Sequence, residues 1–187
     1  MNVFDFDGTI YHGDSERDFF FYCLKKYPKT RKKIPKCLLL GLGYGLKIVK
    51  KDKFKQYFLS FLSLLDDVDK AVIEFWDANE GKIHKWYHKM KQPSDVIISA
   101  SPEFFLKPIA KRLGAECVMG TLADKHTGKY EVNCHGANKV VRFREVYPDA
   151  QIDEFYSDRY SDTPLAKLAK KAVLVKGERL GEWKKFK

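Results

Sequence analysis

The sequence predicts an α/β fold in which a Rossmann-like parallel sheet carries an inserted helical domain. The first observation is a short apolar strand near the N-terminus that runs into a loop with two aspartates, residues 2–9. The second is a long segment with helical spacing, from about residue 11 to residue 90. The third is an alternation of strand-like and helix-like runs after residue 96, an order that produces a parallel sheet.

The inserted segment is too long for a simple connection between two strands. Aromatic and leucine side chains recur in it at steps of three and four residues, over 54–65 and again over 68–90. This spacing is typical of one face of an amphipathic helix. We therefore predict a helical cap domain over residues 13–90, and a core domain formed by residues 1–12 together with residues 91–187.

Strands and helices alternate along the rest of the chain. Val96-Ile97-Ile98 predicts a buried strand. The next helix is expected to have Ser101 as its N-cap and Pro102 in its first turn, and to stop at Gly114. Further strands are predicted at 117–119, 154–157 and 172–175, and further helices at 139–146 and 164–171.

The chain is basic, with a net charge of +10 over 187 residues. A positive surface attracts polyanions, among them nucleic acid, acidic lipid head groups and phosphorylated metabolites, and composition does not choose between these. The four cysteines are widely spaced, without the spacing of a zinc or redox motif. Acidic residues precede any long apolar run at the N-terminus. Together these two features predict a reduced, cytoplasmic location.

The loop Asp5-Phe6-Asp7-Gly8-Thr9 contains two candidate catalytic aspartates separated by a single residue. In an open parallel sheet, ligands bind beyond the carboxyl ends of the strands, where both aspartates would stand. Two carboxylates this close repel each other unless a cation or a shared proton compensates. Mg²⁺ is the expected cofactor, because it takes oxygen ligands and keeps positions for water and phosphate.

Three later segments place further polar groups at the same rim of the sheet. Asp158 and Asp162 follow a predicted strand and add two carboxylates. Ser99 ends another predicted strand just before a helix N-terminus, where a hydroxyl and amides can receive an anion. Lys139 lies at the start of a predicted helix, so its ammonium could balance a phosphate and the carboxylates together.

With these elements in this order, the chain resembles the haloacid dehalogenase-like superfamily. The DFDGT sequence that begins at Asp5 resembles its first motif, and Ser99 its second. Lys139 resembles the third motif, and Asp158 with Asp162 the fourth. The resemblance spans most of the chain, and a DxDGT sequence alone would arise by chance in about one such chain in a thousand.

The resemblance implies a role for each of these residues. Asp5 would attack phosphorus and become an aspartyl-phosphate, while Asp7 would protonate the leaving oxygen and then activate water. The implied metal ligands are Asp5, the Asp7 backbone carbonyl, Asp158 and, nearby or through water, Asp162. The implied phosphate-binding residues are Gly8, Thr9, Ser99, Ala100 and Lys139.

Details around the motifs refine the resemblance. Dehalogenases of the superfamily lack an acid at the position of Asp7, so the chain is similar to the phosphatases. The inserted segment is similar to the C1-type cap of the phosphoserine phosphatase-like branch, which covers the site and selects the substrate. Asp14 stands where a substrate-reading glutamate is expected. The stretches 99–102, 134–139 and 156–162 resemble phosphatidylglycerophosphatase C-type proteins, whose cap has an apolar segment that meets the membrane.

Residues 34–49 form the most apolar stretch of the chain. It is too short and too interrupted by lysine to span a bilayer. It is either a buried cap helix whose glycines permit close packing, which the sequence favours, or a helix that lies on an anionic membrane surface. The second alternative is supported by four flanking lysines, whose positive charge suits an anionic membrane surface: Lys32, Lys33, Lys50 and Lys51.

The sequence thus predicts a Mg²⁺-dependent phosphomonoester hydrolase. Its substrate is expected to be a small phosphorylated metabolite such as phosphoserine or a sugar phosphate, or a lipid phosphate such as phosphatidylglycerophosphate. No nucleic-acid partner is expected, contact with the inner face of the membrane through the cap stays open, and the sequence does not indicate an oligomeric state. Two other hypotheses are a basic membrane- or nucleic-acid-binding protein on this fold, and a phosphotransferase that passes the phosphoryl group to an alcohol.

Overall fold

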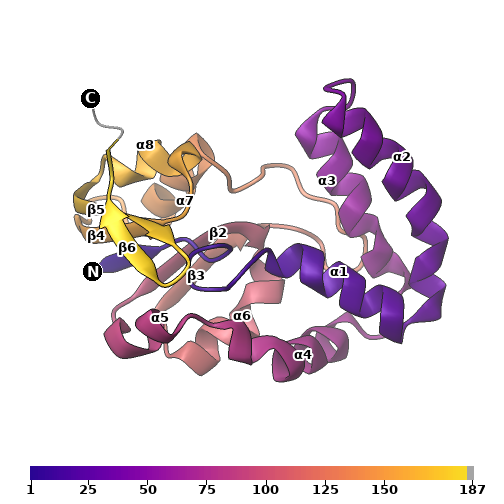
Figure 1. Ribbon diagram of the computed structural model, residues 1–187, viewed down its shortest axis with the longest axis horizontal. Coiled ribbons are helices and arrows are strands. Elements are labelled where there is room, and N and C mark those ends of the chain that lie inside the picture. The colour runs from indigo at the N-terminus through magenta and orange to yellow at the C-terminus, as the bar shows by residue number, and fades with distance from the viewer. Residues whose placement is uncertain (185–187) are drawn as a thin grey trace.

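A computed structural model describes residues 1–184 of the chain. It contains a six-stranded sheet in the order β3-β2-β1-β4-β5-β6, in which β6 pairs antiparallel with β5 and the other pairs are parallel. Figure 1 shows this sheet on one side of the molecule and a lobe of long helices on the other. The strands are β1 (Asn2–Phe4), β2 (Val96–Pro102), β3 (Cys117–Thr121), β4 (Ile152–Ser157), β5 (Ala169–Lys176) and β6 (Arg179–Glu182).

The central strand β1 fixes where a ligand can bind. Val3 pairs with Val96 of β2 on one side and with Phe155 of β4 on the other. All three are buried, as is typical of the central strands of a parallel sheet. The strand order reverses between β1 and β4, so the loops that follow these two strands bound a crevice at the carboxyl edge of the sheet. The loop after β1 begins with Asp5.

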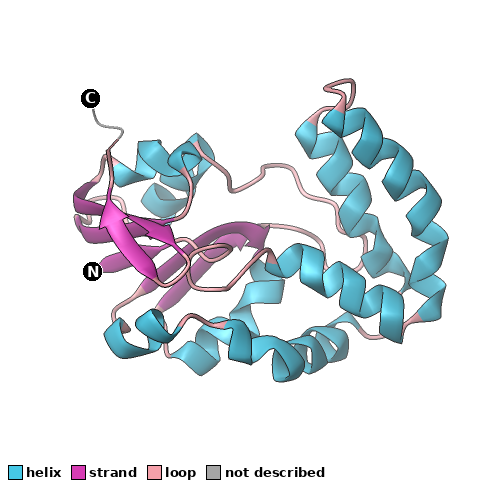
Figure 2. Ribbon diagram, viewed as in Figure 1, coloured by secondary structure: helices cyan, strands magenta, loops and turns pink. Residues whose placement is uncertain are grey.

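Helices fill the segment between β1 and β2, as the sequence predicts. In Figure 2 the first three long helices form the lobe beside the sheet, and the later two lie beneath it with α6 (Glu103–Leu113). The helices of this segment are α1 (Ser15–Lys26), α2 (Ile34–Gly45), α3 (Lys51–Leu59), α4 (Val68–Asn79) and α5 (Lys85–Met90), with the 3₁₀ turns η1 (Pro28–Lys33), η2 (Ser60–Leu64) and η3 (Glu80–Lys82).

The helical pattern over 68–90 is interrupted in the structure. The chain leaves α4 at Asn79, and backbone groups of residues 82–84 pair with the loop after β1 instead of continuing a helix. His12 N–H donates to Lys82 O at 2.9 Å, and His84 N–H donates to Ile10 O at 2.9 Å. These tertiary hydrogen bonds offset the loss of helical ones, so the apolar spacing alone could not show the break.

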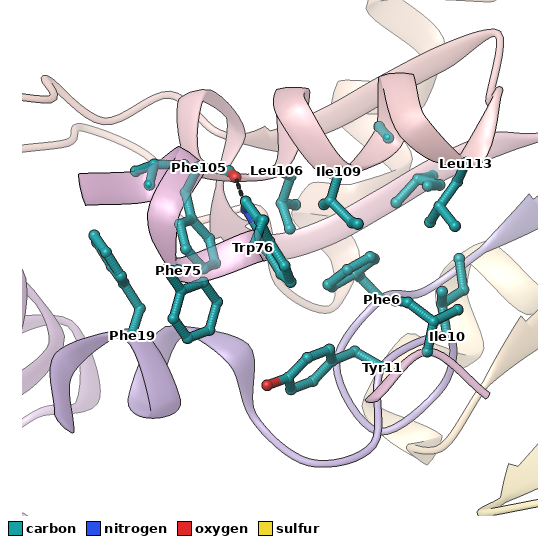
Figure 3. Close-up of a cluster of buried hydrophobic side chains, with 14 of the residues drawn as sticks. Phe6, Ile10, Tyr11, Phe19, Phe75, Trp76, Phe105, Leu106, Ile109 and Leu113 are labelled. Atoms are coloured by element: carbon teal, nitrogen blue, oxygen red, sulfur yellow. Dashed lines mark hydrogen bonds between the residues drawn. The ribbon is translucent and has the colours of Figure 1, made fainter. Parts of the chain in front are cut away.

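An aromatic cluster joins the inserted helices to the sheet (Figure 3). Phe75 and Trp76 of α4 contact Phe105 of α6, with ring centroids 5.5 and 4.8 Å apart. Trp76 Nε1–H donates to Phe105 O at 2.8 Å, which satisfies the one polar atom of the indole. Phe4 of β1 and Phe19 of α1 belong to the same buried cluster. Because both predicted domains share this core, the boundaries at residues 12 and 90 stay a prediction.

The C-terminal third differs from the prediction in two places. The helix over 139–146 is confirmed as α7 (Ala137–Val146), but the helix predicted over 164–171 is wrong. Only α8 (Thr163–Ala166) forms, because β5 already begins at Ala169, which pairs with Ile152 of β4. The short antiparallel strand β6 was not predicted.

The prediction that the apolar stretch 34–49 is a buried helix is wrong. None of the residues of α2 is buried. Tyr44 stacks on Phe54 of α3, with ring centroids 5.5 Å apart, so α2 packs against α3. Six large apolar side chains, each at least 42% exposed, make up what we call the α2 surface: Leu38, Leu39, Leu42, Tyr44, Leu46 and Ile48. Within residues 1–184, no helix is both long and apolar enough to cross a membrane.

Candidate active site

The loops after β1 and β4 meet at Gly8. Asp5 continues the sheet ladder, since its N–H donates to Tyr156 O at 2.8 Å. Gly8 has a φ of +74°, and a Cβ there would lie 2.4 Å from Asp158 Oδ2, so only glycine fits. Asp158 N–H in turn donates to Thr9 Oγ1 at 2.9 Å. These contacts bring the first and fourth predicted motifs together.

Lys139 joins two of the predicted carboxylates. Its Nζ lies 2.7 Å from Asp5 Oδ1 and 2.7 Å from Asp162 Oδ2, and all three side chains are buried. Ser157 Oγ–H donates to the same Asp162 oxygen at 2.9 Å. Although burial alone would lower it, the two carboxylates raise the pKa of Lys139, so its ammonium stays charged. Asp162 therefore holds Lys139, and Lys139 holds Asp5.

The environment of the remaining carboxylate, Asp158, indicates whether the site suits a divalent cation. Its Oδ1 is buried and has no hydrogen-bond partner within residues 1–184. Burial raises the pKa of Asp158 against the opposing effect of Arg159, whose Nε lies 3.3 Å from Asp158 Oδ2. Burial also raises the pKa of Asp5 to about 7, against the opposing effect of Lys139. Buried carboxylate oxygens that lack enough positive charge are suitable ligands for Mg²⁺.

The predicted metal ligands differ in how far other groups already engage them. No group of three or more His, Cys, Asp and Glu side chains in the described part of the chain has the arrangement of a metal site. Asp162, the third predicted carboxylate, is engaged by Lys139 and Ser157. Asp158 Oδ1 and the Asp5 carboxylate are therefore suitable ligands for the ion, and the Asp7 carbonyl and Asp162 stay predicted ligands.

Asp7 is held by hydrogen bonds on both of its carboxylate oxygens. Ser15 N–H, the first amide of α1, donates to Oδ1 at 2.7 Å. Ser101 Oγ–H donates to Oδ2 at 2.6 Å, and Ser99 Oγ lies 3.5 Å from the same oxygen. Burial, and then the nearby Asp14 carboxylate, raise the pKa of Asp7, while the hydrogen bonds from Ser101 and Ser15 oppose that rise.

Ser101 is not the helix cap that the sequence predicts. β2 continues to Pro102, which itself takes the N-cap position of α6 without a side-chain hydrogen bond. The predicted end of α6 is confirmed, because Gly114 caps it with a φ of +74° in the left-handed region. The hydroxyl of Ser101 is thus available to Asp7, a contact that no sequence pattern indicated.

The amides of Gly8 and Thr9 are used within their own loop. Gly8 N–H donates to Tyr11 O at 2.9 Å, and Thr9 N–H donates to Phe6 O at 3.2 Å. These bonds close the turn that holds Asp7. Gly8 and Thr9 are two of the implied phosphate-binding residues. In the structure, their backbone amides stabilise the loop.

A lysine from the helical lobe reaches the end of β2. Lys55 Nζ–H of α3 donates to Ala100 O at 2.6 Å and to Asn133 Oδ1 at 3.0 Å. It also lies 3.6 Å from Glu16 Oε2, and burial raises the pKa of Glu16 to about 7 against the opposing effect of Lys55. No sequence pattern indicated this pair, because nothing local distinguishes Lys55 from the lysines around it.

Asp14 lies at the N-terminus of α1. Its Oδ1 accepts a hydrogen bond from Arg17 N–H at 2.9 Å, the contact of an N-cap. Asp14 also lines the cavity described next. The residue that the sequence marks for substrate binding is therefore a helix cap as well, and one of its oxygens is occupied.

A cavity of about 680 Å³ lies between the predicted catalytic carboxylates and the helical lobe. Its polar end contains Asp5, Asp7, Ser99 and Lys139. Its other walls are mostly apolar and come from α1, α2 and α3: Phe20, Leu24, Leu38, Leu42, Phe54 and Phe58. A volume of this size suits a ligand larger than phosphate alone.

Comparisons with known proteins agree with this geometry. The sequence model of the haloacid dehalogenase-like hydrolase family matches residues 3–167. The protein CicA of Caulobacter vibrioides is 28% identical over 193 residues, which cover 89% of this chain and 82% of CicA.

Solved structures share the fold. A protein of unknown function from Bordetella pertussis has a TM-score of 0.75 at 18% identity and covers 93% of this chain and 88% of its own. A phosphoserine phosphohydrolase-like protein from Francisella tularensis has a TM-score of 0.58 at 19% identity, with coverage of 93% and 87%.

Proposed function

Because the chain belongs to the haloacid dehalogenase-like hydrolase family, we propose that it is a Mg²⁺-dependent phosphatase that transfers a phosphoryl group to Asp5 and then to water. The observation that supports this most is the buried Lys139, 2.7 Å from Asp5 and 2.7 Å from Asp162 at the carboxyl edge of the sheet. The direct test is release of phosphate from a panel of phosphorylated metabolites and lipids, with Mg²⁺ and with a chelator.

The first half-reaction forms the aspartyl-phosphate. A carboxylate oxygen of Asp5 bonds to phosphorus, the ester bond to the leaving oxygen breaks, and that oxygen takes a proton from Asp7. Lys139 holds Asp5 through Oδ1 and neutralises negative charge at the polar end of the cavity. The carboxylates of Asp5 and Asp158 and the Asp7 carbonyl would hold Mg²⁺, which supplies further positive charge against the phosphoryl oxygens.

The second half-reaction restores the enzyme. Asp7, now a carboxylate, accepts a proton from water as the water oxygen bonds to phosphorus and the bond to Asp5 breaks. Ser99, within β2, lines the cavity together with Asp5 and Asp7 and would bind the phosphoryl group there. Its hydroxyl lies 3.5 Å from Asp7, so the two groups can face one phosphate together.

The cavity walls favour an apolar substrate among those that the sequence left open. Phosphoserine and sugar phosphates have polar groups next to the phosphate, which need hydrogen-bonding partners when buried. The cavity offers charged groups from α1 and α3 near its polar end, and phenylalanine and leucine side chains beyond them. A phosphate ester with a hydrocarbon chain, such as a lipid phosphate, would place its phosphate and its chain accordingly.

The length of an alkyl chain should therefore govern the rate. We expect kcat/KM to rise along a series of straight-chain alkyl phosphates, by up to about fourfold per methylene group, since burying one contributes about 0.8 kcal/mol. Phosphoserine should lie at the low end of the series. Steady-state phosphate release measures this. A flat dependence on chain length, or a preference for phosphoserine, would contradict the proposed substrate class.

The α2 surface offers a place for such a substrate to enter. Leu38 and Leu42 line the cavity and are also exposed, so the apolar lining continues from the site to the surface. Exposed basic side chains flank it: Lys29, Arg31, Lys32, Lys36, Lys47, Lys50 and Lys53. An apolar surface with a basic border suits the interface of an anionic membrane, so we propose that this surface contacts lipid.

Vesicle binding tests this contact. We expect the wild-type protein to sediment with vesicles that contain anionic lipid, and a Leu39→Gln, Ile48→Gln double variant to bind at least about tenfold more weakly, because each change removes apolar area from the contact. Val141→Gln is the matched control, an exposed apolar residue of α7 far from the α2 surface in sequence. Equal sedimentation of the double variant and the control would contradict the proposal.

A further inference from the structure

Ser101 makes a shorter contact with Asp7 than Ser99 does. Ser101 Oγ lies 2.6 Å from Asp7 Oδ2, compared with 3.5 Å for Ser99 Oγ. Ser101 is only 3% exposed. We propose that Ser101 is a positioning residue, which holds the Asp7 carboxyl group in one orientation for both of its proton transfers. This inference rests on the proposed function, because it assigns the proton transfers to Asp7.

The backbone around Ser101 is fixed on several sides. The pairing of β2 with β3 shifts register between Ile98 and Pro102, and the hydroxyls of Ser99 and Ser101 both lie near Asp7 Oδ2. Ser101 N–H donates to Ser99 Oγ at 3.1 Å. A Cβ at Gly120 of the adjacent strand would lie 2.6 Å from Ser101 O, so the absence of a side chain there allows β3 to approach closely.

The peptide that precedes Ser101 is anchored by two further side chains. Ala100 O accepts hydrogen bonds from Thr121 Oγ1–H at 2.6 Å and from Lys55 Nζ–H at 2.6 Å. Thr121 belongs to β3 and Lys55 to α3, so both the sheet and the helical lobe hold this peptide. These hydrogen bonds restrict the backbone at Ser101, and so they also restrict the position of its hydroxyl group.

The two oxygens of Asp7 have different partners, and this fixes which one exchanges the proton. A backbone amide can only donate, so the bond from Ser15 N–H keeps Oδ1 as an acceptor. The proton that Asp7 gives and takes is then on Oδ2. Ser101 Oγ–H can donate to a lone pair of Oδ2 whether or not that oxygen carries the proton, which leaves the proton for the leaving oxygen. Asp7 can thus act as acid and then as base without rotating.

A comparison of two leaving groups tests this role. An alkoxide needs a proton from Asp7 to leave, whereas p-nitrophenolate leaves without one. For Ser101→Ala we expect kcat/KM for an alkyl phosphate to fall by about 10- to 100-fold, and kcat/KM for p-nitrophenyl phosphate to change by less than about threefold. The ratio of the two values does not depend on how much of the variant is folded.

Two further variants complete the experiment. Ser101→Thr keeps the hydroxyl and should restore most of the wild-type ratio. Ser63→Ala is the matched control, because the Ser63 hydroxyl donates to Ser60 O at 2.8 Å in the helical lobe, and it should leave the ratio unchanged. An active Ser101→Ala variant with the wild-type ratio would overturn the role of Ser101 alone. A wild-type protein that hydrolyses neither substrate would overturn the proposed function and, with it, this role.

Discussion

Replacement of Asp5 by asparagine is expected to abolish phosphate release, with a loss of about 10⁴-fold or more. An amide has nearly the shape of a carboxylate but is far too weak a nucleophile to attack phosphorus. Steady-state phosphate release from p-nitrophenyl phosphate with Mg²⁺ measures the loss, since this leaving group removes any dependence on proton donation. Magnesium-dependent turnover by Asp5→Asn at more than a trace of the wild-type rate would contradict the assignment of Asp5.

The same variant should remain folded. Lys139 keeps its ion pair with Asp162 when Asp5 becomes neutral, so no buried charge is left without a partner. We expect the free energy of unfolding to change by less than about 2 kcal/mol. Asp66→Asn is the matched control, because Asp66 is exposed and forms its ion pair with Lys29 at the surface. It should change neither activity nor stability.

Lys139→Met is expected to cost both stability and activity. Methionine fills a similar volume without charge, and its introduction leaves the buried carboxylates of Asp5 and Asp162 without their shared cation. Removing one partner of a buried ion pair typically costs about 3–5 kcal/mol. Chemical denaturation, followed by circular dichroism, measures the change in the free energy of unfolding.

A surface lysine provides the control for this experiment. Lys171 forms an ion pair with Glu154 at 2.7 Å, but its side chain is 65% exposed. Solvent screens such a pair, so Lys171→Met should cost no more than about 1 kcal/mol. If the two lysine variants lost equal stability, the buried ion pairs of Lys139 would not contribute to the free energy of unfolding as we expect.

The sequence could predict the centre of the site because its residues follow strands. Asp5 comes directly after β1, and Asp158 and Asp162 come shortly after β4, the strand beside it. The carboxyl ends of parallel neighbours lie at one edge of the sheet, so position in the chain translates into position in space. Lys139 is an exception, since it lies in the first turn of α7, well after the end of β3 at Thr121, and only its place at a predicted helix start and its motif indicated it.

The features that the sequence did not predict depend on contacts between distant segments. The hydroxyl of Ser101 bonds to Asp7, 94 residues earlier in the chain, and Lys55 reaches Ala100, 45 residues later. The break of the helical pattern near residue 82 likewise needs the loop after β1 as its hydrogen-bonding partner. No local propensity encodes such pairings.

The exposure of α2 is a different kind of failure. Its apolar content is typical of a buried helix, and a helix that meets lipid has the same composition. Only the position of α2 at the outside of the lobe separates the two cases, as Figure 1 shows. The sequence thus identified the unusual segment correctly but could not give its surroundings.

The central claim is that Asp5 receives the phosphoryl group. The most direct measurement is to mix the protein with excess substrate and Mg²⁺, stop the reaction in acid during turnover, and map phosphorylated peptides by mass spectrometry. We expect one added phosphoryl group on the peptide that contains Asp5, removed by hydroxylamine and missing from the Asp5→Asn variant. Rapid phosphate release with no phosphoryl group on that peptide at any time in the turnover would contradict it.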